Sequence, residues 1–393
     1  MIFESSPKVS RPRGGTLFLC TFGMVMTVAD VERVIEEWAP KWIAWDRDNV
    51  GLQIGNKDHR VSRILVALEL TGKVVSEAVR KRVDLIITHH PPFFHPVSSI
   101  TDADQLGSDI LLLARNGIAV YSAHTNLDFA KDGVSFVLAE KLGLTHPEFL
   151  SPLEGNLAKV VVFVPGTHVD QVAQAMSSSG AGNIGEYGSC SFRVEGTGTF
   201  RGSEKSKPYA GTRGLLERTN EVRLEMVVPK GALESTIKGI KKVHPYEEVA
   251  YDVYPLQNRD ANFGMGVIGR LRTAVRLETF LKHAKKVLHT SVLKYCGKKE
   301  QMIQTIAVCG GSGSELLEDA VRRGADAFLT ADVRYHTFHS ALGKIALVDA
   351  GHFETEIGIL EALTRRLQTS FSRSKYKVSI ITTQYSTNPV CCI

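Results

Sequence analysis

The feature that most restricts the fold of this chain is a repeated alternation of short apolar strands with amphipathic helices. Residues 61–70 (VSRILVALEL), 83–90 (VDLIITHH) and 118–128 (IAVYSAHTNLD) are predicted strands, and residues 71–82 and 102–117 are the predicted helices between them. Apolar strands without polar alternation are typical of sheets covered on both faces. Helical crossovers of this length join parallel strands. The pattern therefore predicts an α/β fold with mostly parallel sheets.

The alternation is interrupted in the middle of the chain and then resumes. At 393 residues the chain is too long for one ordinary core. We predict an α/β lobe over residues 26–155 and a second α/β lobe over residues 258–393. Residues 156–257 have the order β-α-β-β-α-β, which indicates an inserted ferredoxin-like α+β domain. Residues 1–25 are expected to be a disordered arm or the product of a mis-assigned start, rather than a signal peptide.

Charge, hydropathy and cysteine spacing exclude several kinds of partner. The net charge of +5 is small for this length, and basic residues are scattered among acidic ones, so a nucleic-acid partner is not expected. No apolar run approaches the roughly 18–20 residues that span a bilayer, so no membrane partner is expected. None of the six cysteines lies in a CxxC arrangement, which favours unpaired thiols and a cytoplasmic location.

Histidines and carboxylates follow the predicted strands of both outer segments. They come in four pairs along the chain: His89 and His90, His124 and Asp128, Asp332 and His336, and His352 and Glu356. In open α/β sheets, ligands bind in the crevice beyond the carboxyl ends of the strands. Four strand ends therefore deliver metal-binding or acid–base groups to the same kind of edge.

The local spacing of these residues fits a metal site. His352 and Glu356 are four residues apart and share one face if a helix begins there. His89 and His90 would point to opposite sides of a regular strand. Either the strand turns before the following prolines, so that both rings serve one metal, or each ring serves a separate metal. Three imidazoles and two carboxylates suit Zn, Mn, Fe, Co or Ni better than calcium, and a carboxylate that bridges two such ions would give a centre able to activate water.

Each motif also has a purely structural explanation. HHPP is typical of a turn, HTNLD of an Asx-type turn, and HFETE of an acidic helix start. The Gly-rich segment CGGSGSELLEDA (residues 309–320) would either bind a substrate phosphate or allow close packing of a strand against a helix. His244, Glu247 and Glu248 in the insert are expected to form a helix-to-strand turn. The joint placement at one sheet edge favours a metal site for the outer motifs.

Six motifs together resemble those of the NIF-three-like family, whose members are also known as GTP cyclohydrolase 1 type 2 homologues. The motifs are DNVGLQIG, DLIITHHPPFF, SAHTNLD, VCGGSGSELLEDA, TADVRYH and DAGHFETE. The resemblance extends from about residue 27 to the end of the chain, and HPYEEVAYDVYPL resembles the PII/CutA-like insert of the longer members. It implies a two-lobed α/β fold with a dinuclear metal site between the lobes. It also implies a homohexamer built as a trimer of dimers.

The resemblance implies roles for individual residues as well. The implied ligands of two divalent first-row transition-metal ions are His89, His90, Asp128, His352 and Glu356. His124 and His336 would line the cavity and serve as general acid–base groups. The expected function is metal-dependent hydrolysis of a small phosphorylated or nucleotide-like substrate, as in a GTP cyclohydrolase 1 type 2-like enzyme. The alternative is a non-enzymatic regulatory or scaffold protein whose insert binds a ligand or partner.

Overall fold

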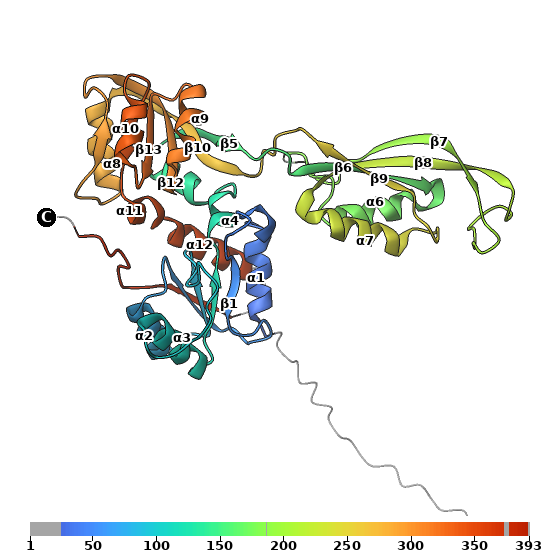
Figure 1. Ribbon diagram of the computed structural model, residues 1–393, viewed down its shortest axis with the longest axis horizontal. Coiled ribbons are helices and arrows are strands. Elements are labelled where there is room, and N and C mark those ends of the chain that lie inside the picture. The colour runs from blue at the N-terminus through green and yellow to red at the C-terminus, as the bar shows by residue number, and fades with distance from the viewer. Residues whose placement is uncertain (1–24, 186, 373–376, 392–393) are drawn as a thin grey trace, which may run out of the picture.

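The computed structural model describes residues 25–185, 187–372 and 377–391 (Figure 1). Two bodies of sheet and helix lie next to each other, and a third body projects from them as an arm. The predicted N-terminal extension lies outside the described residues, apart from Val25. None of the helices in the described segments is long and apolar enough to cross a membrane.

The first sheet is mostly parallel, as the sequence predicted. Its five strands lie in the order β1-β4-β3-β2-β15, and only the β1–β4 pair is antiparallel. The strands are β1 (Gly51–Ile54), β2 (Arg63–Ala67), β3 (Leu85–Thr88), β4 (Ala119–Ser122) and β15 (Ser379–Thr382).

Helices cover both faces of this first sheet. Alternate residues of β2 face opposite sides, so Ile64 packs with α1 (Val28–Glu36) and α12 (Ile359–Ser372). Leu65 packs on the other side with α2 (Gly72–Lys81) and α3 (Gln105–Arg115). Burial on both faces explains why these strands are apolar throughout.

The second sheet is mixed, so the prediction of mostly parallel sheets is wrong for this part of the chain. Its order is β11-β14-β13-β12-β10-β5, and only the β12–β13 and β13–β14 pairs are parallel. The strands are β5 (Thr145–Pro152), β10 (Gly264–Arg276), β11 (Lys294–Cys296), β12 (Met302–Ser312), β13 (Ala327–Ala331) and β14 (Ala346–Asp349). β5 leads into the insert and β10 leads out of it, so the chain returns beside itself and the two strands pair antiparallel.

Helices also cover the second sheet on both faces. One face carries α5 (Val134–Lys141) and α8 (Leu277–Val287). The other carries α9 (Leu317–Arg322) and α10 (Tyr335–Ala341). The described part of this second body is therefore a sheet buried between helices, like the first.

The two outer segments of the chain exchange strands. β5 comes from the first segment but lies in the second sheet, whereas β15 comes from the second segment but lies in the first sheet. The helix α12 likewise packs on the first sheet. The sequence-based limits at residues 155 and 258 do not anticipate this exchange, because hydrophobic periodicity identifies a strand but not the sheet in which it pairs.

The insert forms the projecting arm of Figure 1. Its four strands lie in the order β7-β8-β6-β9, with every pair antiparallel, and two helices share one core with the sheet. The order β-α-β-β-α-β agrees with the prediction, while a closer kinship to PII or CutA stays a prediction. The elements are β6 (Leu157–Pro165), α6 (Val169–Ser178), β7 (Phe192–Arg201), β8 (Leu216–Pro229), α7 (Leu233–Val243) and β9 (Tyr251–Leu256).

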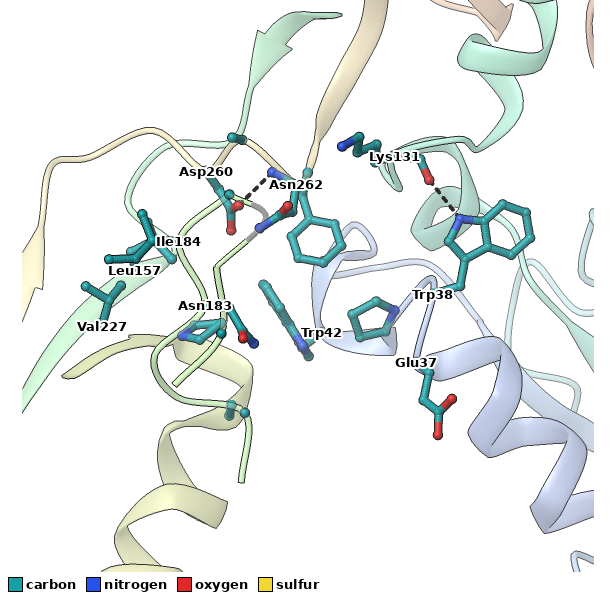
Figure 2. Close-up of a pocket in the computed structure, with 18 of the residues that line it drawn as sticks. Glu37, Trp38, Trp42, Lys131, Leu157, Asn183, Ile184, Val227, Asp260 and Asn262 are labelled. Atoms are coloured by element: carbon teal, nitrogen blue, oxygen red, sulfur yellow. Dashed lines mark hydrogen bonds between the residues drawn. The ribbon is translucent and has the colours of Figure 1, made fainter. Parts of the chain in front are cut away.

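The insert meets the body of the protein at Trp42, beside a cavity of about 770 Å³ (Figure 2). Trp42, in the 3-10 helix Lys41–Ile43, lies edge-on to Phe263 with ring centroids 5.2 Å apart. The same ring lies against Gly231 of the insert, where a Cβ atom would come within 2.0 Å of it. Glycine at this position therefore allows the insert to contact Trp42 directly.

A buried carboxylate ties α2 to the segment after β15. Glu77 accepts hydrogen bonds from the Thr383 hydroxyl and the Gln384 N–H, and it pairs with Lys81 Nζ at 2.6 Å. Burial raises the pKa of Glu77, but the bonds from these partners outweigh burial and hold the pKa below its usual value. This carboxylate therefore stabilises the fold at neutral pH, and its contribution is lost as the pH falls through the lowered pKa.

We expect Glu77→Ala to lower the free energy of unfolding at pH 7 by about 2–3 kcal/mol, because it leaves its partners without an acceptor. Urea denaturation of the purified protein measures this change. Thr383→Val removes only one of the bonds and should lower the free energy of unfolding by about 1 kcal/mol. A Glu77→Ala protein as stable as the wild type would contradict the assignment.

Candidate metal centre

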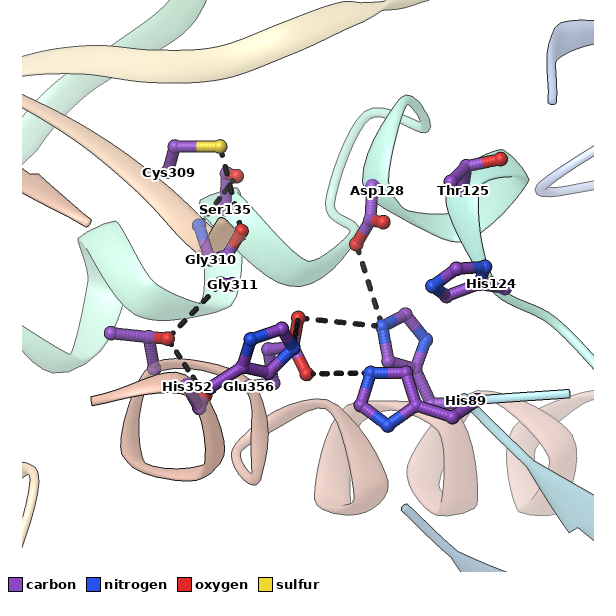
Figure 3. A network of polar contacts seen from close by, with 12 residues as sticks. His89, His124, Thr125, Asp128, Ser135, Cys309, Gly310, Gly311, His352 and Glu356 are labelled. Atoms are coloured by element: carbon purple, nitrogen blue, oxygen red, sulfur yellow. Dashed lines mark hydrogen bonds and ion pairs between the residues drawn. The ribbon is translucent and has the colours of Figure 1, made fainter. Parts of the chain in front are cut away.

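Four histidines and two carboxylates meet where the carboxyl edges of the two sheets face each other (Figure 3). The first sheet supplies two pairs of residues. One pair directly follows β3, and the other follows β4, at the two ends of a turn that includes α4 (Thr125–Asp128). The second sheet supplies the two ends of α11 (His352–Glu356), which follows β14. The six residues are His89, His90, His124, Asp128, His352 and Glu356.

The strand that carries His89 and His90 turns before it reaches them. β3 ends at Thr88, and the His90 N–H donates to the Leu68 carbonyl at 2.9 Å. The two imidazole rings are 4.9 Å apart between centroids and tilted by 45°. Of the two arrangements that the sequence left open, the structure has the turned strand, with both rings in one cluster.

Each of the four histidines is held at its Nδ1 atom by an oxygen. The four pairs are His89 with the Ala123 carbonyl at 2.8 Å, His90 with Glu69 at 3.1 Å, His124 with Asp48 at 2.9 Å, and His352 with Asp332 at 2.6 Å. A carbonyl or carboxylate oxygen accepts, so Nδ1 carries the proton and a neutral ring presents its Nε2 lone pair. Metal-binding imidazoles are oriented in this way by partners of this kind.

Glu356 lies among the Nε2 atoms of three of the four histidines. Its carboxylate oxygens are 3.1 Å from Nε2 of His90 and 3.1 Å from Nε2 of His352. Nε2 of His89 lies 3.9 Å from Glu356 Oε1 and 3.6 Å from Asp128 Oδ1. Side chains from three separate segments therefore direct nitrogen and oxygen atoms toward one small region.

The cluster contains buried polar atoms without a hydrogen-bond partner in the described structure. His89 Nε2 and Asp128 Oδ1 are both in this state, although they face each other. Buried polar groups are nearly always satisfied, so such a pair calls for an occupant. Two triads have ligand atoms within 4.8 Å of one another: His89 with His90 and His124, and His90 with His352 and Glu356. The donor set therefore fits a metal ion.

The charges of the cluster depend on these close contacts. Burial lowers the pKa of His90, but Glu356 and Glu69 raise it to about 10. The bond to Glu356 raises the pKa of His352 to about 9, with burial opposing and Asp332 assisting. These rings hold protons in the absence of another cation.

The two carboxylates of the cluster shift in opposite directions. Burial raises the pKa of Glu356, but the adjacent imidazoles of His352, His89 and His90 hold it well below its usual value. Burial raises the pKa of Asp128, and attraction to His89 offsets only part of this increase. Metal binding would favour the ionised form of both groups.

The Gly-rich segment packs against the cluster. Gly311 has φ +64°, and a Cβ atom there would lie 2.2 Å from Glu356 Oε1. Its N–H donates to the Thr355 hydroxyl at 3.0 Å. At Gly313, a Cβ atom would lie 2.4 Å from Cys309 Sγ. These contacts favour the packing explanation of the segment over phosphate binding.

The positions of His124 and His336 differ from those that the sequence predicted. His124, expected to line the cavity, belongs to one of the two metal-competent triads. His336 lies on α10 and is exposed, and its contacts in the described structure are with Tyr335 and Ser340 rather than with the cluster. Asp332 is not in the triads but supports His352.

The sequence prediction missed Glu69 and Asp48, which orient His90 and His124. Glu69 follows β2 by two residues, so the rule used for the other strand ends would have found it. Asp48 precedes β1, which is antiparallel to β4, so the start of β1 lies at the edge where the parallel strands end. Burial raises the pKa of Asp48, but hydrogen bonds from His124 and Thr125 lower it to about 2. Asp48 is therefore ionised at neutral pH.

Known proteins are similar to this chain over nearly its full length. The sequence profile of Duf34/NIF3 (NGG1p interacting factor 3) matches residues 26–389. A GTP cyclohydrolase 1 type 2 homolog of Halalkalibacterium halodurans is 38% identical over 369 residues, which cover 93% of this chain and 99% of that protein. The Bacillus subtilis protein of the same name is 39% identical over 359 residues, with 91% and 96% covered.

Solved structures agree with these sequence comparisons. A Bacillus cereus protein related to NIF3 superposes with a TM-score of 0.82 at 38% identity, covering 94% of this chain and all of that one. A Staphylococcus aureus protein superposes with a TM-score of 0.76 at 29% identity, with 94% and 99% covered. The chain described here therefore belongs to the Duf34/NIF3 family.

Proposed function

We propose that this protein is a metal-dependent hydrolase that holds two divalent first-row transition-metal ions, of Zn, Mn, Fe, Co or Ni, between its two sheets. The observation that carries the proposal is the shared arrangement of four imidazoles, each held at Nδ1 by an oxygen, which leaves Nε2 of each ring as the atom that can bind a metal. The proposed ligands are His89, His90, His124, Asp128, His352 and Glu356. Bound ions of this kind lower the pKa of a water and polarise the bond that it attacks.

The protein's own residues orient this donor set. The carboxylates of Glu69, Asp48 and Asp332 and the carbonyl of Ala123 fix the tautomers of the four rings. Asp48 does so as a fully ionised group, with a pKa of about 2. A general acid–base role for His336 stays a prediction without support from its contacts.

The substrate in this proposal is a small phosphorylated or nucleotide-like molecule. Its support is chemical, because two metal ions suit phosphoester and ring-opening hydrolysis, and the name of the relatives points to the same class. We further propose a cytoplasmic homohexamer, a trimer of dimers, with a mass in solution six times that of one chain. Light scattering of the purified protein measures that mass.

Turnover assays test the proposal. Metal-loaded protein should hydrolyse at least one of GTP, another nucleotide or a generic phosphoester, and removal of the metal by a chelator should abolish the activity. His89→Ala should be inactive, whereas His283→Ala, which changes an exposed histidine of α8, should match the wild type. If metal-loaded protein turns over none of these substrates, the hydrolase proposal fails and the cluster serves another purpose.

The non-enzymatic alternative has one observation in its favour. The insert contains a cavity of about 630 Å³ whose lining includes Tyr209, Tyr246 and Glu221. The Tyr246 hydroxyl donates to Glu221 at 2.8 Å. A cavity of this size suits a small ligand, as a regulatory protein requires. Turnover of any of these substrates by the metal-loaded protein would contradict the non-enzymatic alternative.

Metal affinity is expected to rise with pH. In the metal-free protein the pKa is about 10 for His90 and about 9 for His352, so both rings carry protons at pH 7 that a metal ion must displace. Competition titrations against a chelator of known affinity, at pH 6, 7 and 8, should show tighter binding at each step. Calorimetry in buffers of different ionisation enthalpy should show protons released on binding. Affinity independent of pH would contradict the ligand assignment.

A further inference from the structure

Two large aromatic side chains are exposed next to the metal-competent cluster. Phe94 is 57% exposed, and its ring lies edge-on to the His124 imidazole with centroids 5.7 Å apart. Trp45 is 53% exposed, and its ring lies edge-on to Phe129 at 5.7 Å. Both residues therefore keep much of their apolar surface in water near the cluster of histidines and carboxylates.

Trp45 is fixed in place by the groups that orient His124. Its backbone N–H donates to the Thr125 hydroxyl oxygen at 3.1 Å, and that hydroxyl donates to Asp48. Asp48 in turn holds His124 Nδ1 at 2.9 Å. The position of Trp45 is thus coupled to the cluster through three consecutive hydrogen bonds.

The loop that carries Phe94 is attached to the same segment. Asn49, four residues after Trp45, donates from Nδ2 to the Phe93 carbonyl at 2.9 Å. Asn49 is itself bonded to Gln53 at 2.7 Å. These bonds fix the backbone next to Phe94 relative to the segment that carries Trp45.

The cavity beside Trp45 is too small for an organic ligand. This cavity, which Asp128 and Thr125 also line, has a volume of about 40 Å³. That space accommodates water, but not a ring. This cavity therefore excludes a substrate ring and leaves the exposed parts of Trp45 and Phe94 for contact with it.

We propose that Trp45 and Phe94 are specificity residues that stack against a planar heteroaromatic ring of the substrate. This inference rests on the proposed function. The metal site would bind the reacting group of the substrate, and Trp45 and Phe94 would bind the ring of the same molecule. Aromatic side chains bind flat heterocycles through their faces, and stacking tolerates differences in ring substituents. A substrate consisting of a phosphorylated sugar alone would leave both faces without a partner.

Calorimetric titration of metal-loaded protein with guanosine and, separately, with inorganic phosphate tests the inference. Guanosine supplies the ring without a phosphate, and phosphate supplies the anion without a ring. Trp45→Ala and Phe94→Ala should each weaken guanosine binding by about tenfold or more, with phosphate binding and metal content unchanged. Trp45→Phe should retain most of the guanosine affinity. Phe192→Ala, which changes an exposed aromatic residue of the insert, should bind both probes like the wild type.

Three results would overturn the inference. The first is a wild type that binds metal and phosphate but not guanosine. The second is a Trp45→Ala, Phe94→Ala double variant that binds guanosine as tightly as the wild type. The third is a change of solution mass in either single variant, which would make these side chains contacts between subunits. None of these results would contradict the proposed metal site. A protein that binds no metal would instead contradict both the proposed function and this inference.

Discussion

His89→Ala protein is expected to purify without bound metal. His89 is 1% exposed, its Nδ1 is held by the Ala123 carbonyl, and its Nε2 has no hydrogen-bond partner among the described residues. Changes to the outer partners of a ligand alone weaken metal binding by about 10- to 100-fold. Loss of the ligand itself should therefore weaken binding by at least about 100-fold. Elemental analysis after dialysis against metal-free buffer measures the loss.

The control for this variant is His283→Ala, which should retain the wild-type metal content. Removal of a buried ring also leaves a cavity, so the thermal unfolding of both variants must be compared in the presence of a chelator. A folded His89→Ala protein with full metal content would remove His89 from the ligand set. It would also show that the turn after β3 does not bring both adjacent histidines into one metal site.

Glu356→Gln is expected to have the second largest effect. Glu356 is 4% exposed and contacts His90 and His352 at 3.1 Å, so its charge holds both rings in their protonated state in the metal-free protein. The neutral amide has nearly the same shape but removes an anionic ligand from the centre of the cluster. We expect metal affinity to fall by at least about 100-fold, and fewer protons to be released when metal binds at pH 7.

Glu354→Gln provides a matched control on the same helix. Glu354 lies two residues from Glu356, and its carboxylate accepts from Asn388 Nδ2 at 3.1 Å, outside the cluster. Titrations of the two variants with the same metal should show weaker metal binding for Glu356→Gln than for Glu354→Gln. Equal affinities would show that the charge of Glu356 has no special role in binding.

The sequence predicted which side chains come together better than it predicted the sheets. Residues after strand ends come together whenever the strands are parallel, so the positions of His89, Asp128 and His352 followed from the order of apolar strands and helices. The glycine at position 311 was open to two interpretations, because only the folded structure reveals that Glu356 occupies the space of a side chain there.

The remaining features depend on pairings between distant segments. β15 pairs with β2 across more than 300 residues, and no local pattern specifies this pairing. Asp48 was missed because the sequence does not reveal that β1 runs antiparallel to β4. His336 was predicted to approach the site because it follows β13, but it is the second residue of α10 and is exposed.

Diffraction from crystals of metal-loaded protein, recorded above and below the absorption edge of the bound metal, tests the proposed two-metal site directly. We expect two anomalous peaks per chain, both within coordination distance of the six-residue cluster, with His90 or Glu356 adjacent to each. A metal-to-chain ratio near two from elemental analysis should accompany them. Peaks elsewhere in the chain, or none in a protein loaded with an excess of these ions, would refute the two-metal site.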